Sequence, residues 1–276
     1  MRILLLAPHS FYIDRGTPID VDLVLRALSE RGETVDAVVY HEGEDRSYPG
    51  VTLHRIAPPR GLRRWLTGIG PGFSVRKLVC DVMLLLRAWK LARKGGYDLV
   101  HAGEEAVFFA MLFRRLYGLP YVYDMDSSIA QQMVEKMPWL SPLAGFFNAC
   151  EGAAARSAVA VAPVCNALAD LATEHGAAHV VTLHDISQLK NPDRAPTGEL
   201  RRRLGLRDGV PILMYVGNLE AYQGVDLLFD GFAAAIGRGV DVDLVVAGGD
   251  DRDIEKYRQK AARLGIAERT HLIGRW

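Results

Sequence analysis

Short apolar runs alternate with longer stretches of helical periodicity along the chain. The first run, residues 3–7, is continuous, which is typical of a parallel strand buried on both faces. Apolar residues then recur at helical spacing from Asp20 to Glu30, and Gly32 ends this predicted helix. The same patterns predict strands at 35–40, 51–56, 98–102, 121–123, 158–162 and 180–183, and helices at 75–93, 106–117, 149–156 and 166–175. Such alternation predicts a parallel sheet with helices on both faces.

The alternation breaks at residues 186–198, which contain two prolines and few apolar side chains, a composition typical of a linker. It then resumes with strands at 211–216, 242–247 and 271–273 and helices at 225–237 and 253–264. We therefore expect a first unit at 1–185, a linker at 186–200 and a second unit at 201–276. The second unit has 76 residues, fewer than a usual domain, and stops directly after its third strand. We expect it to be incomplete in this chain.

Composition and charge narrow the class of protein. The chain has 33 Lys and Arg residues against 33 Asp and Glu residues, whereas a nucleic-acid-binding domain is usually strongly basic. Its three cysteines have no metal-ligand spacing, which indicates reduced thiols in a cytoplasmic protein. No apolar run approaches the roughly 20 residues of a membrane span, and the apolar N-terminus is too short for a signal peptide. We expect a soluble or peripherally membrane-bound protein without a nucleic-acid partner.

Residues 60–94 concentrate positive charge. They hold nine basic side chains against one acid, Asp81, with Trp65, Phe73 and Trp89 interleaved. This segment begins with a loop rich in Gly, Pro and Arg, at 57–74, and continues into the helix predicted at 75–93. Basic and aromatic side chains together suit the anionic inner face of a membrane. The alternative is a solvated helix face whose apolar stripe packs on the core.

Glycine-containing segments follow the strands of the second unit in order. They are YVGNLEAYQG (215–224), VVAGGD (245–250) and HLIG (271–274). Glycine at the carboxyl end of a parallel strand lets a phosphate or sugar approach the backbone, and a helix N-terminus beyond it favours anions. The alternative is an ordinary tight turn, which needs glycine in any α/β fold.

In order and spacing these segments resemble the donor-binding domain of the retaining GT-B glycosyltransferases called family 4. The N-terminal strand, the loop before Asp20 and YDLVHAGEEA (97–106) resemble the acceptor domain of that family. The resemblance implies two Rossmann-like parallel-sheet domains, the first for the acceptor and the second for a nucleotide-diphosphate sugar. It implies transfer to a hydroxyl of a glycan or lipid-linked acceptor, with retention and without a metal or other cofactor. The implied donor-binding positions are Gly217, Asn218, Gln223, Gly224, Gly248 and Gly249.

The chain departs from the family pattern at several positions. Where family members commonly hold the diphosphate with an Arg and a Lys, this chain has Asn218 and Gln223. Where many carry a histidine beside the reacting sugar, it has Asp124 and Asp126. The Glu-rich helix motif for the donor sugar lies, in the family, after the third strand and thus beyond Trp276. We therefore expect little or no transferase activity from this chain as it stands.

Polar residues at the strand ends of the first unit form the candidate acceptor site, since ligands of open α/β sheets bind there. Asp126 is the candidate catalytic residue, because a carboxylate can accept the proton of a hydroxyl. The alternatives are helix capping by the Asp, Ser and Glu side chains, and a packed or solvated His9. His184 and Asp185 are expected at the hinge or as a buried polar pair. The candidate acceptor-binding residues are His9, Gly16, Thr17, His101, Glu104, Asp124 and Ser127.

Two other classes of protein compete with the enzyme. A non-catalytic GT-B-like binding or scaffold protein is favoured by the loss of both basic positions. A dinucleotide-dependent oxidoreductase is disfavoured, because no G-x-G-x-x-G follows a predicted strand. A metal site is disfavoured as well, since His101, Glu104 and Glu105 supply two ligand types within five residues and no complete ligand set.

Overall fold

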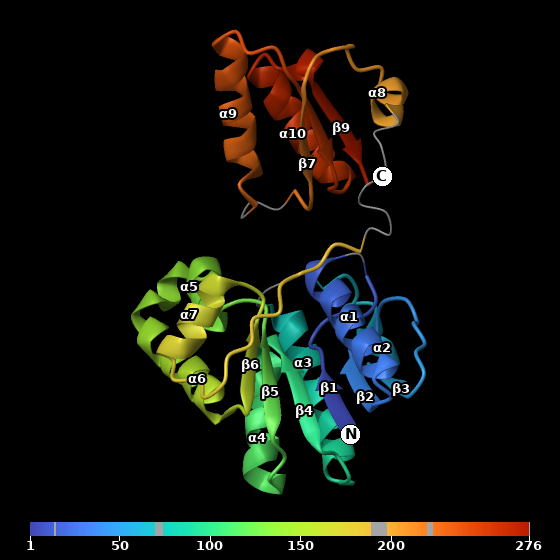
Figure 1. Ribbon diagram of the computed structural model, residues 1–276, viewed down its shortest axis with the longest axis vertical. Helices are drawn as coiled ribbons and strands as arrows, with labels where there is room; N and C mark the ends of the chain where they lie inside the picture. The colour runs from blue at the N-terminus through green and yellow to red at the C-terminus, as the bar shows by residue number, and fades with distance from the viewer. Residues whose placement is uncertain (14, 70–73, 189–197, 220–222, 276) are drawn as a thin grey trace. The chain divides into compact units, whose positions relative to one another are not determined.

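The computed structural model describes residues 1–13, 15–69, 74–188, 198–219 and 223–275. The chain divides into two compact units, Met1–Ser187 and Gln188–Trp276. Each unit has a parallel sheet and a core of its own (Figure 1). The prediction of an α/β protein with two parallel sheets is therefore confirmed.

Six parallel strands form the sheet of the first unit, in the order β3-β2-β1-β4-β5-β6. The chain order reverses between β1 and β4, which makes this pair the switch point where open α/β sheets bind ligands. Because all six strands run the same way, their carboxyl ends share one edge of the sheet. The strands are β1 (Arg2–Leu6), β2 (Thr34–Val39), β3 (Val51–Arg55), β4 (Leu99–Gly103), β5 (Tyr121–Met125) and β6 (Ala160–Pro163).

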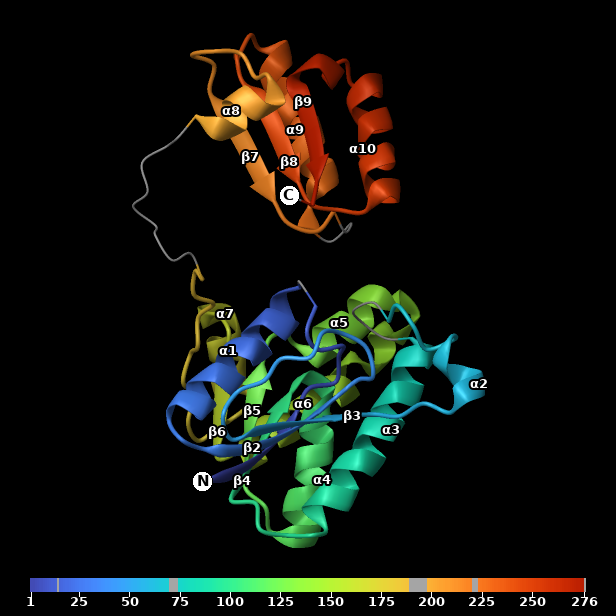
Figure 2. The same cartoon turned by 90° about the vertical axis from the view of Figure 1, so that its right-hand side faces the viewer.

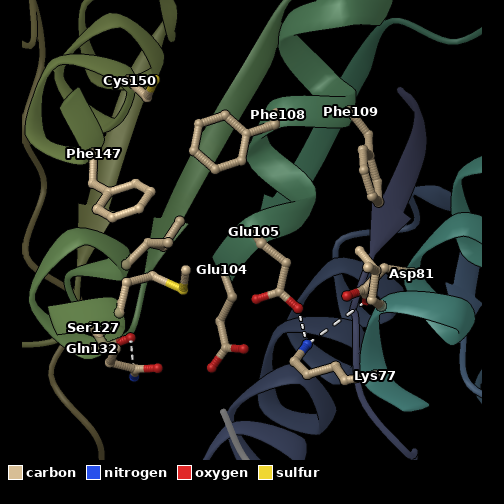
Figure 3. Close-up of a pocket in the computed structure, with 13 residues that line it drawn as sticks. Lys77, Asp81, Glu104, Glu105, Phe108, Phe109, Ser127, Gln132, Phe147 and Cys150 are labelled. Carbon is tan, nitrogen blue, oxygen red and sulfur yellow. Dashed lines mark hydrogen bonds and ion pairs between the residues drawn. The ribbon is translucent and has the colours of Figure 1, made fainter. Parts of the chain in front are cut away.

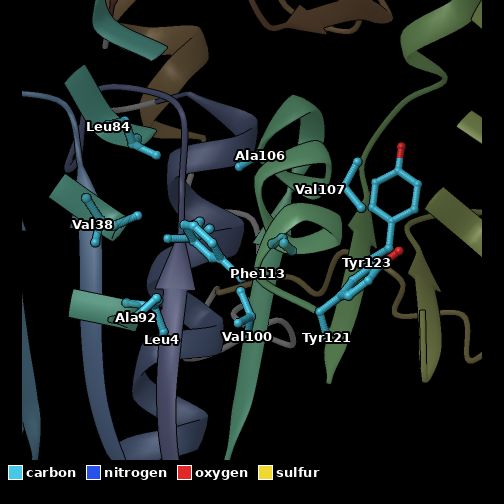
Figure 4. Close-up of a cluster of buried hydrophobic side chains, with 14 of the residues drawn as sticks. Leu4, Val38, Leu84, Ala92, Val100, Ala106, Val107, Phe113, Tyr121 and Tyr123 are labelled. Carbon is cyan, nitrogen blue, oxygen red and sulfur yellow. The ribbon is translucent and has the colours of Figure 1, made fainter. Parts of the chain in front are cut away.

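Helices cover both faces of this sheet, and the alternation along β1 separates the two cores. Leu4 and Leu6 pack with side chains of α3, α4 and α6 (Figure 4). Ile3 and Leu5 pack against α1. Burial on both faces explains why β1 is a continuous apolar run. The helical elements are α1 (Gly16–Glu30), α2 (Arg60–Arg63), α3 (Val75–Ala92), η1 (Glu104–Ala106), α4 (Val107–Tyr117), α5 (Ile129–Lys136), η2 (Pro138–Leu143), α6 (Ala144–Ser157) and α7 (Asn166–Glu174).

The second unit has three parallel strands in the order β7-β8-β9, flanked by helices (Figure 2). Phe229 of α9 and Tyr257 of α10 stack in its core, with ring centroids 5.0 Å apart. The elements are α8 (Glu199–Leu204), β7 (Ile212–Val216), α9 (Val225–Gly237), β8 (Asp243–Ala247), α10 (Asp251–Arg263), η4 (Ala267–Arg269) and β9 (Thr270–Gly274). None of the helices in the described ranges is both long and apolar enough to cross a membrane.

Several predicted elements differ from the structure. The strand predicted at 180–183 is wrong. Val180 makes an isolated bridge to Val161, and the N–H groups of Val181 and Leu183 donate to carbonyls of β6, but both of these side chains stay exposed. The loop predicted at 57–74 contains α2, while 70–73 lie outside the described residues. Most of the predicted linker, 189–197, also lies outside them. The first helix begins at Gly16, four residues before the predicted start.

Candidate functional site

Three carboxyl groups meet at the carboxyl edge of the six-stranded sheet. Asp124 is in β5, Asp126 follows it, and Asp20 lies in the second turn of α1. The three residues each place a carboxylate oxygen within 4.8 Å of the others. Tyr123 and Met125 enter the core on the α3 face, so Asp124, which lies between them in β5, points toward α1. We call Asp20, Asp124 and Asp126 the acidic cluster.

Burial and mutual repulsion keep part of the acidic cluster protonated. Burial, with the charges of Asp124 and Asp20, raises the pKa of Asp126 to about 9. Burial and the charge of Asp124 raise the pKa of Asp20 to about 6. At neutral pH Asp126 therefore carries a proton that it can donate in a hydrogen bond. Once ionised, it is a stronger base than an ordinary aspartate.

A histidine of the neighbouring strand holds Asp124. Nε2 of His101 lies 2.8 Å from Oδ2 of Asp124. In register His101 pairs with Val122, two residues deeper in the sheet than Asp124. Burial disfavours the charged imidazole, but the Asp124 carboxylate outweighs burial and raises the pKa of His101. His101 was predicted to contact the acceptor; in the structure it lies behind Asp124 and orients it.

His9 follows β1 at the same edge. Its Nδ1 lies 3.1 Å from the Ser10 carbonyl, to which it donates, so Nε2 is left as an acceptor. Nε2 is buried and has no hydrogen-bond partner among the described residues. Burial, with the nearby charge of Lys77, lowers the pKa of His9 to about 4. His9 is therefore neutral at physiological pH and offers an acceptor nitrogen.

A strained residue ends β4. Glu104 has a φ of 45°, in the left-handed region that residues with a side chain rarely adopt. Such a conformation costs on the order of 1–3 kcal/mol and persists where the surrounding structure imposes it, often at functional sites. The charge of Glu104 adds to the groups that raise the pKa of Asp126. Glu104 therefore belongs electrostatically to the edge that carries the acidic cluster.

A buried lysine ties α3 to the strand ends. Lys77 forms an ion pair with Glu105, and its Nζ donates to the carbonyl of Pro8 at 3.0 Å. Oδ1 of Asp81 lies 3.7 Å from the same Nζ. Burial lowers the pKa of Lys77 despite these acidic partners. Lys77 therefore connects the loop after β1 with the turn after β4.

The serines after β5 have different roles. Ser128 caps α5, because its Oγ accepts a hydrogen bond from the backbone N–H of Gln131 at 3.2 Å. The Oγ of Ser127 accepts from the side chain of Gln132 at 2.7 Å. Helix capping therefore accounts for Ser128, while Ser127 and Asp126 remain available to a ligand. Neither η1 nor α4 has a side-chain cap, so capping does not account for Glu104.

The N-terminus of α1 contains Gly16 and Thr17. Arg15 is its N-cap residue and makes no capping hydrogen bond through its side chain. A Cβ on Gly16 would meet no atom within 4 Å, so packing does not require glycine there. The first-turn N–H groups of Gly16 and Thr17 can therefore take an acceptor oxygen. His184 and Asp185 are both exposed, so the predicted buried polar pair is wrong.

In the second unit, glycines let the strand ends approach one another. Gly248 has a φ of 124°, and a Cβ on it would lie 1.9 Å from the carbonyl oxygen of Gly217. Its N–H donates to the carbonyl of Gly274 at 2.7 Å. Gly249 also has a positive φ, of 78°. Backbone packing alone therefore demands Gly248, which supports the tight-turn alternative for this position.

The two long helices of the second unit begin differently. Asp250 caps α10 through a capping box with Asp253, so side chains occupy its first N–H groups. Gly224 precedes α9 in a left-handed conformation, and no side chain caps that helix. Gln223 is exposed beside it, and the Asn218 carbonyl accepts a 2.7 Å hydrogen bond from Tyr215. The start of α9 is therefore the better place for an anion.

Two residues of the site were not predicted from the sequence. Asp20 was taken as the first residue of a helix, whereas the true start at Gly16 places it in the second turn, facing the strand ends. Lys77 was grouped with the basic segment 60–94, although it is buried. A helix that begins at Gly16 puts Asp20 four residues before the partly buried Val24, and so on a face that packs toward the sheet.

The spacing of the acidic cluster is also one that a hard divalent cation accepts, since such ions prefer carboxylate oxygens. Carboxyl groups this close can instead share protons, as the raised pKa values of Asp20 and Asp126 indicate. The expectation that no metal is needed stays a prediction.

Comparisons with known proteins agree with this architecture. Residues 16–207 match the model of the "Glycosyl transferase 4-like domain" family. Over 207 residues the chain is 32% identical to the alpha-D-kanosaminyltransferase of Streptomyces kanamyceticus, covering 70% of this chain and 52% of that protein. The chain thus spans about half the length of this curated relative.

Solved structures share the fold at lower identity. Sucrose-phosphate synthase from Thermosynechococcus elongatus superposes with a TM-score of 0.73 at 17% identity, over 100% of this chain and 70% of that one. HepE from Anabaena, solved with UDP and glucose, superposes with a TM-score of 0.68 at 16% identity, over 100% of this chain and 70% of HepE. The fold is that of the GT-B class. With its family model matched over most of its length, the chain belongs to the glycosyl transferase 4-like family.

Proposed function

We propose that this protein transfers a sugar from a nucleotide-diphosphate sugar to an acceptor hydroxyl, with retention of anomeric configuration. Family membership supports the reaction type. The observation that carries the proposal is the acidic cluster at the switch-point edge of the first sheet, where buried carboxyl groups have raised pKa values. Perturbed titratable groups at such an edge are typical of functional sites.

Asp126 has the catalytic role in this proposal. During transfer the bond between the anomeric carbon and the diphosphate oxygen breaks. The acceptor oxygen bonds to that carbon on the face from which the diphosphate leaves, which retains the configuration, as its hydroxyl proton leaves. The ionised fraction of Asp126, which is small at neutral pH and grows toward pH 9, accepts that proton, and the raised pKa makes this fraction a stronger base than an ordinary aspartate. Asp124, held by His101, orients the hydroxyl. His9, Gly16, Thr17, Glu104 and Ser127 contact the rest of the acceptor.

The donor diphosphate is proposed to bind at the start of α9. The first-turn N–H groups after Gly224, which have no side-chain cap among the described residues, supply a partial positive charge, and the amides of Asn218 and Gln223 add neutral donors. Neutral hydrogen bonds are about half as strong as charge-assisted ones. Gly217, Gly248 and Gly249 let the nucleotide approach the backbone. The complex of HepE with UDP makes UDP the first nucleotide to test. We propose that no metal or other cofactor is needed.

The acceptor is proposed to be a glycan or lipid-linked molecule reached from the inner face of a membrane. Four apolar side chains lie exposed along α3, which we call the α3 stripe: Val75, Leu78, Val82 and Leu86, with exposed fractions of 49–64%. Basic residues continue the same helix at Arg87, Lys90 and Arg93, all of them exposed. Apolar and basic side chains on one exposed helix suit an anionic lipid surface.

Two measurements test the function. Calorimetric titration with UDP, GDP and ADP should detect binding of one nucleotide. Sugar transfer from the matching nucleotide sugar, which we expect to be weak in this chain, is measured by mass spectrometry. Asp126→Asn should lower kcat by about 10²–10⁴-fold, the usual contribution of a general base. Asp170→Asn, an exposed change on α7, is the control. If none of the three nucleotides binds and no sugar is transferred, the non-catalytic scaffold protein is favoured instead.

A further inference from the structure

A cavity of about 310 Å³ lies between α3, α4, α5 and α6, and we call it the α3–α6 chamber. It lies on the face of the sheet opposite α1, because Phe108 and Phe109 of α4 and Met133 of α5 line it. Its volume is about twice that of a roughly 150 Å³ apolar cavity that binds one benzene ring. The chamber therefore has room for an organic group of about a dozen carbon atoms.

The chamber has an apolar body and a polar mouth. Figure 3 shows the rings of Phe108 and Phe147 near each other at one end, with Cys150 beyond them. The carboxylates of Glu104 and Glu105 lie at the other end. An apolar pocket with a few convergent polar groups is the usual form of a small-molecule site.

The polar mouth is built from residues whose positions are fixed. Lys77 holds Glu105 and contacts Asp81, and both acids line the chamber. Ser127 lines it too, with its hydroxyl bonded to Gln132. A polar mouth of this kind suits hydroxyl groups, which can donate to carboxylates and accept from Ser127 or Gln132.

The mouth adjoins the acidic cluster along the edge of the sheet. Ser127 lines the chamber and directly follows Asp126. Glu104 lines the chamber as well, and its charge contributes to the raised pKa of Asp126. A molecule seated in the chamber would therefore place its polar end at Glu104, Glu105 and Ser127, beside the edge that carries the acidic cluster.

We infer that the α3–α6 chamber binds an apolar alkyl or aryl group carried directly by the acceptor, with the acceptor hydroxyl placed at Asp126. This inference rests on the proposed function, because it assigns the chamber to the acceptor of that reaction. The acceptor is then an amphiphile, with a hydroxylated head at the mouth and an apolar group of about a dozen carbons inside. A wholly hydrophilic sugar would leave the aromatic end of the chamber without a partner.

Calorimetry with two glucosides separates the head from the tail. Octyl β-D-glucopyranoside, kept below its micelle concentration, should bind the full chain at least about tenfold tighter than methyl β-D-glucopyranoside, because seven further carbon atoms leave water. Equal affinities for the two glucosides would overturn the inference.

Cysteine chemistry locates the tail in the wild-type protein. Cys150 lines the chamber and Cys165 does not, while both are partly exposed free thiols. Octyl glucoside should slow the alkylation of Cys150 by iodoacetamide at least about threefold, as expected when roughly two thirds of the sites are occupied, and leave Cys165 unchanged. Equal slowing at both thiols, or at neither, would contradict the assignment.

A substitution that fills the chamber tests the same assignment by mutation. Met133→Trp places a larger side chain inside and should weaken octyl glucoside binding at least about tenfold, without changing the affinity for a nucleoside diphosphate. Phe146→Ser removes a side chain that is 63% exposed on the same helix as Phe147 and should leave octyl glucoside binding unchanged. Loss of binding in Phe146→Ser alone would mean surface adsorption. If the protein binds a nucleotide and transfers sugar to a hydrophilic acceptor, but the octyl chain does not increase affinity, the proposed function is supported and only this inference is wrong.

Discussion

The raised pKa of Asp126 lowers the free energy of unfolding of the first unit at neutral and higher pH. Its pKa is about 9 in the folded protein and about 3.9 in an unfolded chain. Between these values the folded protein holds a proton that the unfolded chain has released, so the free energy of unfolding falls as pH rises. Asp126→Asn removes this effect and should stabilise the protein by about 1 kcal/mol or more at pH 8, or about 2–4 °C in Tm, and by less at pH 5.

Thermal unfolding of both proteins at pH 5 and pH 8 checks this prediction. Asp170→Asn, an exposed change on α7, should shift Tm by little at either pH. An effect of Asp126→Asn that is equal at pH 5 and pH 8 would show that Asp126 is already ionised in the folded protein over this range.

Site residues that directly follow a buried strand could be predicted from the sequence. Asp124 and Asp126 come at the end of an apolar run, so their place at the sheet edge could be predicted from the parallel topology. The place of Asp20 could not be predicted, because it depends on where α1 begins. The N-cap residue Arg15 makes no side-chain capping bond and so gives no signal for that start in the sequence. The bond between His101 and Asp124 joins two strands, and their register has no local signal in the sequence.

Among the elements, buried strands were predicted best. β1 is apolar from Ile3 to Leu6 because both faces of the sheet are covered there, so the strand can be predicted from its own sequence. The segment at 180–183 is also mostly apolar, but it lies beside β6 with the side chains of Val181 and Leu183 exposed. α5 and the first turns of α6 were missed, since exposed Trp139, Leu143 and Phe146 interrupt the amphipathic pattern.

The α3 stripe makes a prediction that belongs to one helix. Val82→Asn combined with Leu86→Asn removes two apolar side chains that are 49% and 57% exposed. Binding to vesicles with about a third anionic lipid should fall at least about tenfold, because about 2–3 kcal/mol of apolar burial is lost. Co-sedimentation with the vesicles measures this binding.

Exposed apolar side chains elsewhere in the first unit supply the control for the α3 stripe. Leu116→Asn combined with Leu183→Asn changes side chains that are 49% and 48% exposed, outside α3. This pair should leave vesicle binding as it is in the wild type. If both double variants lose vesicle binding equally, the α3 stripe has no specific role in it. If neither variant loses vesicle binding, the protein does not contact the membrane through α3.

Over the whole chain, each unit builds its own core and its own strand-end edge. The first core joins side chains of β1, β4 and β5 with α3, α4 and α6, and the core of the second unit joins β8 with α9 and α10. The acidic cluster, the strained Glu104 and the α3–α6 chamber all belong to residues before Ser187. The uncapped start of α9 belongs to the second unit. The proposed acceptor site and the proposed donor site therefore belong to units with separate cores.

Separate cores predict that a change in the second unit leaves the stability of the first unchanged. Gly248→Ala puts a Cβ 1.9 Å from the Gly217 carbonyl at a φ of 124°, so it should destabilise the second unit by about 2–4 kcal/mol. Gly237→Ala, at the end of α9 with open space around it, should be neutral or slightly stabilising. Scanning calorimetry should show one unfolding transition moved down by Gly248→Ala and the other, the one raised by Asp126→Asn, unmoved. If Gly248→Ala lowers both transitions together, the two units unfold as one cooperative body, and the stability of the acceptor edge depends on the donor unit.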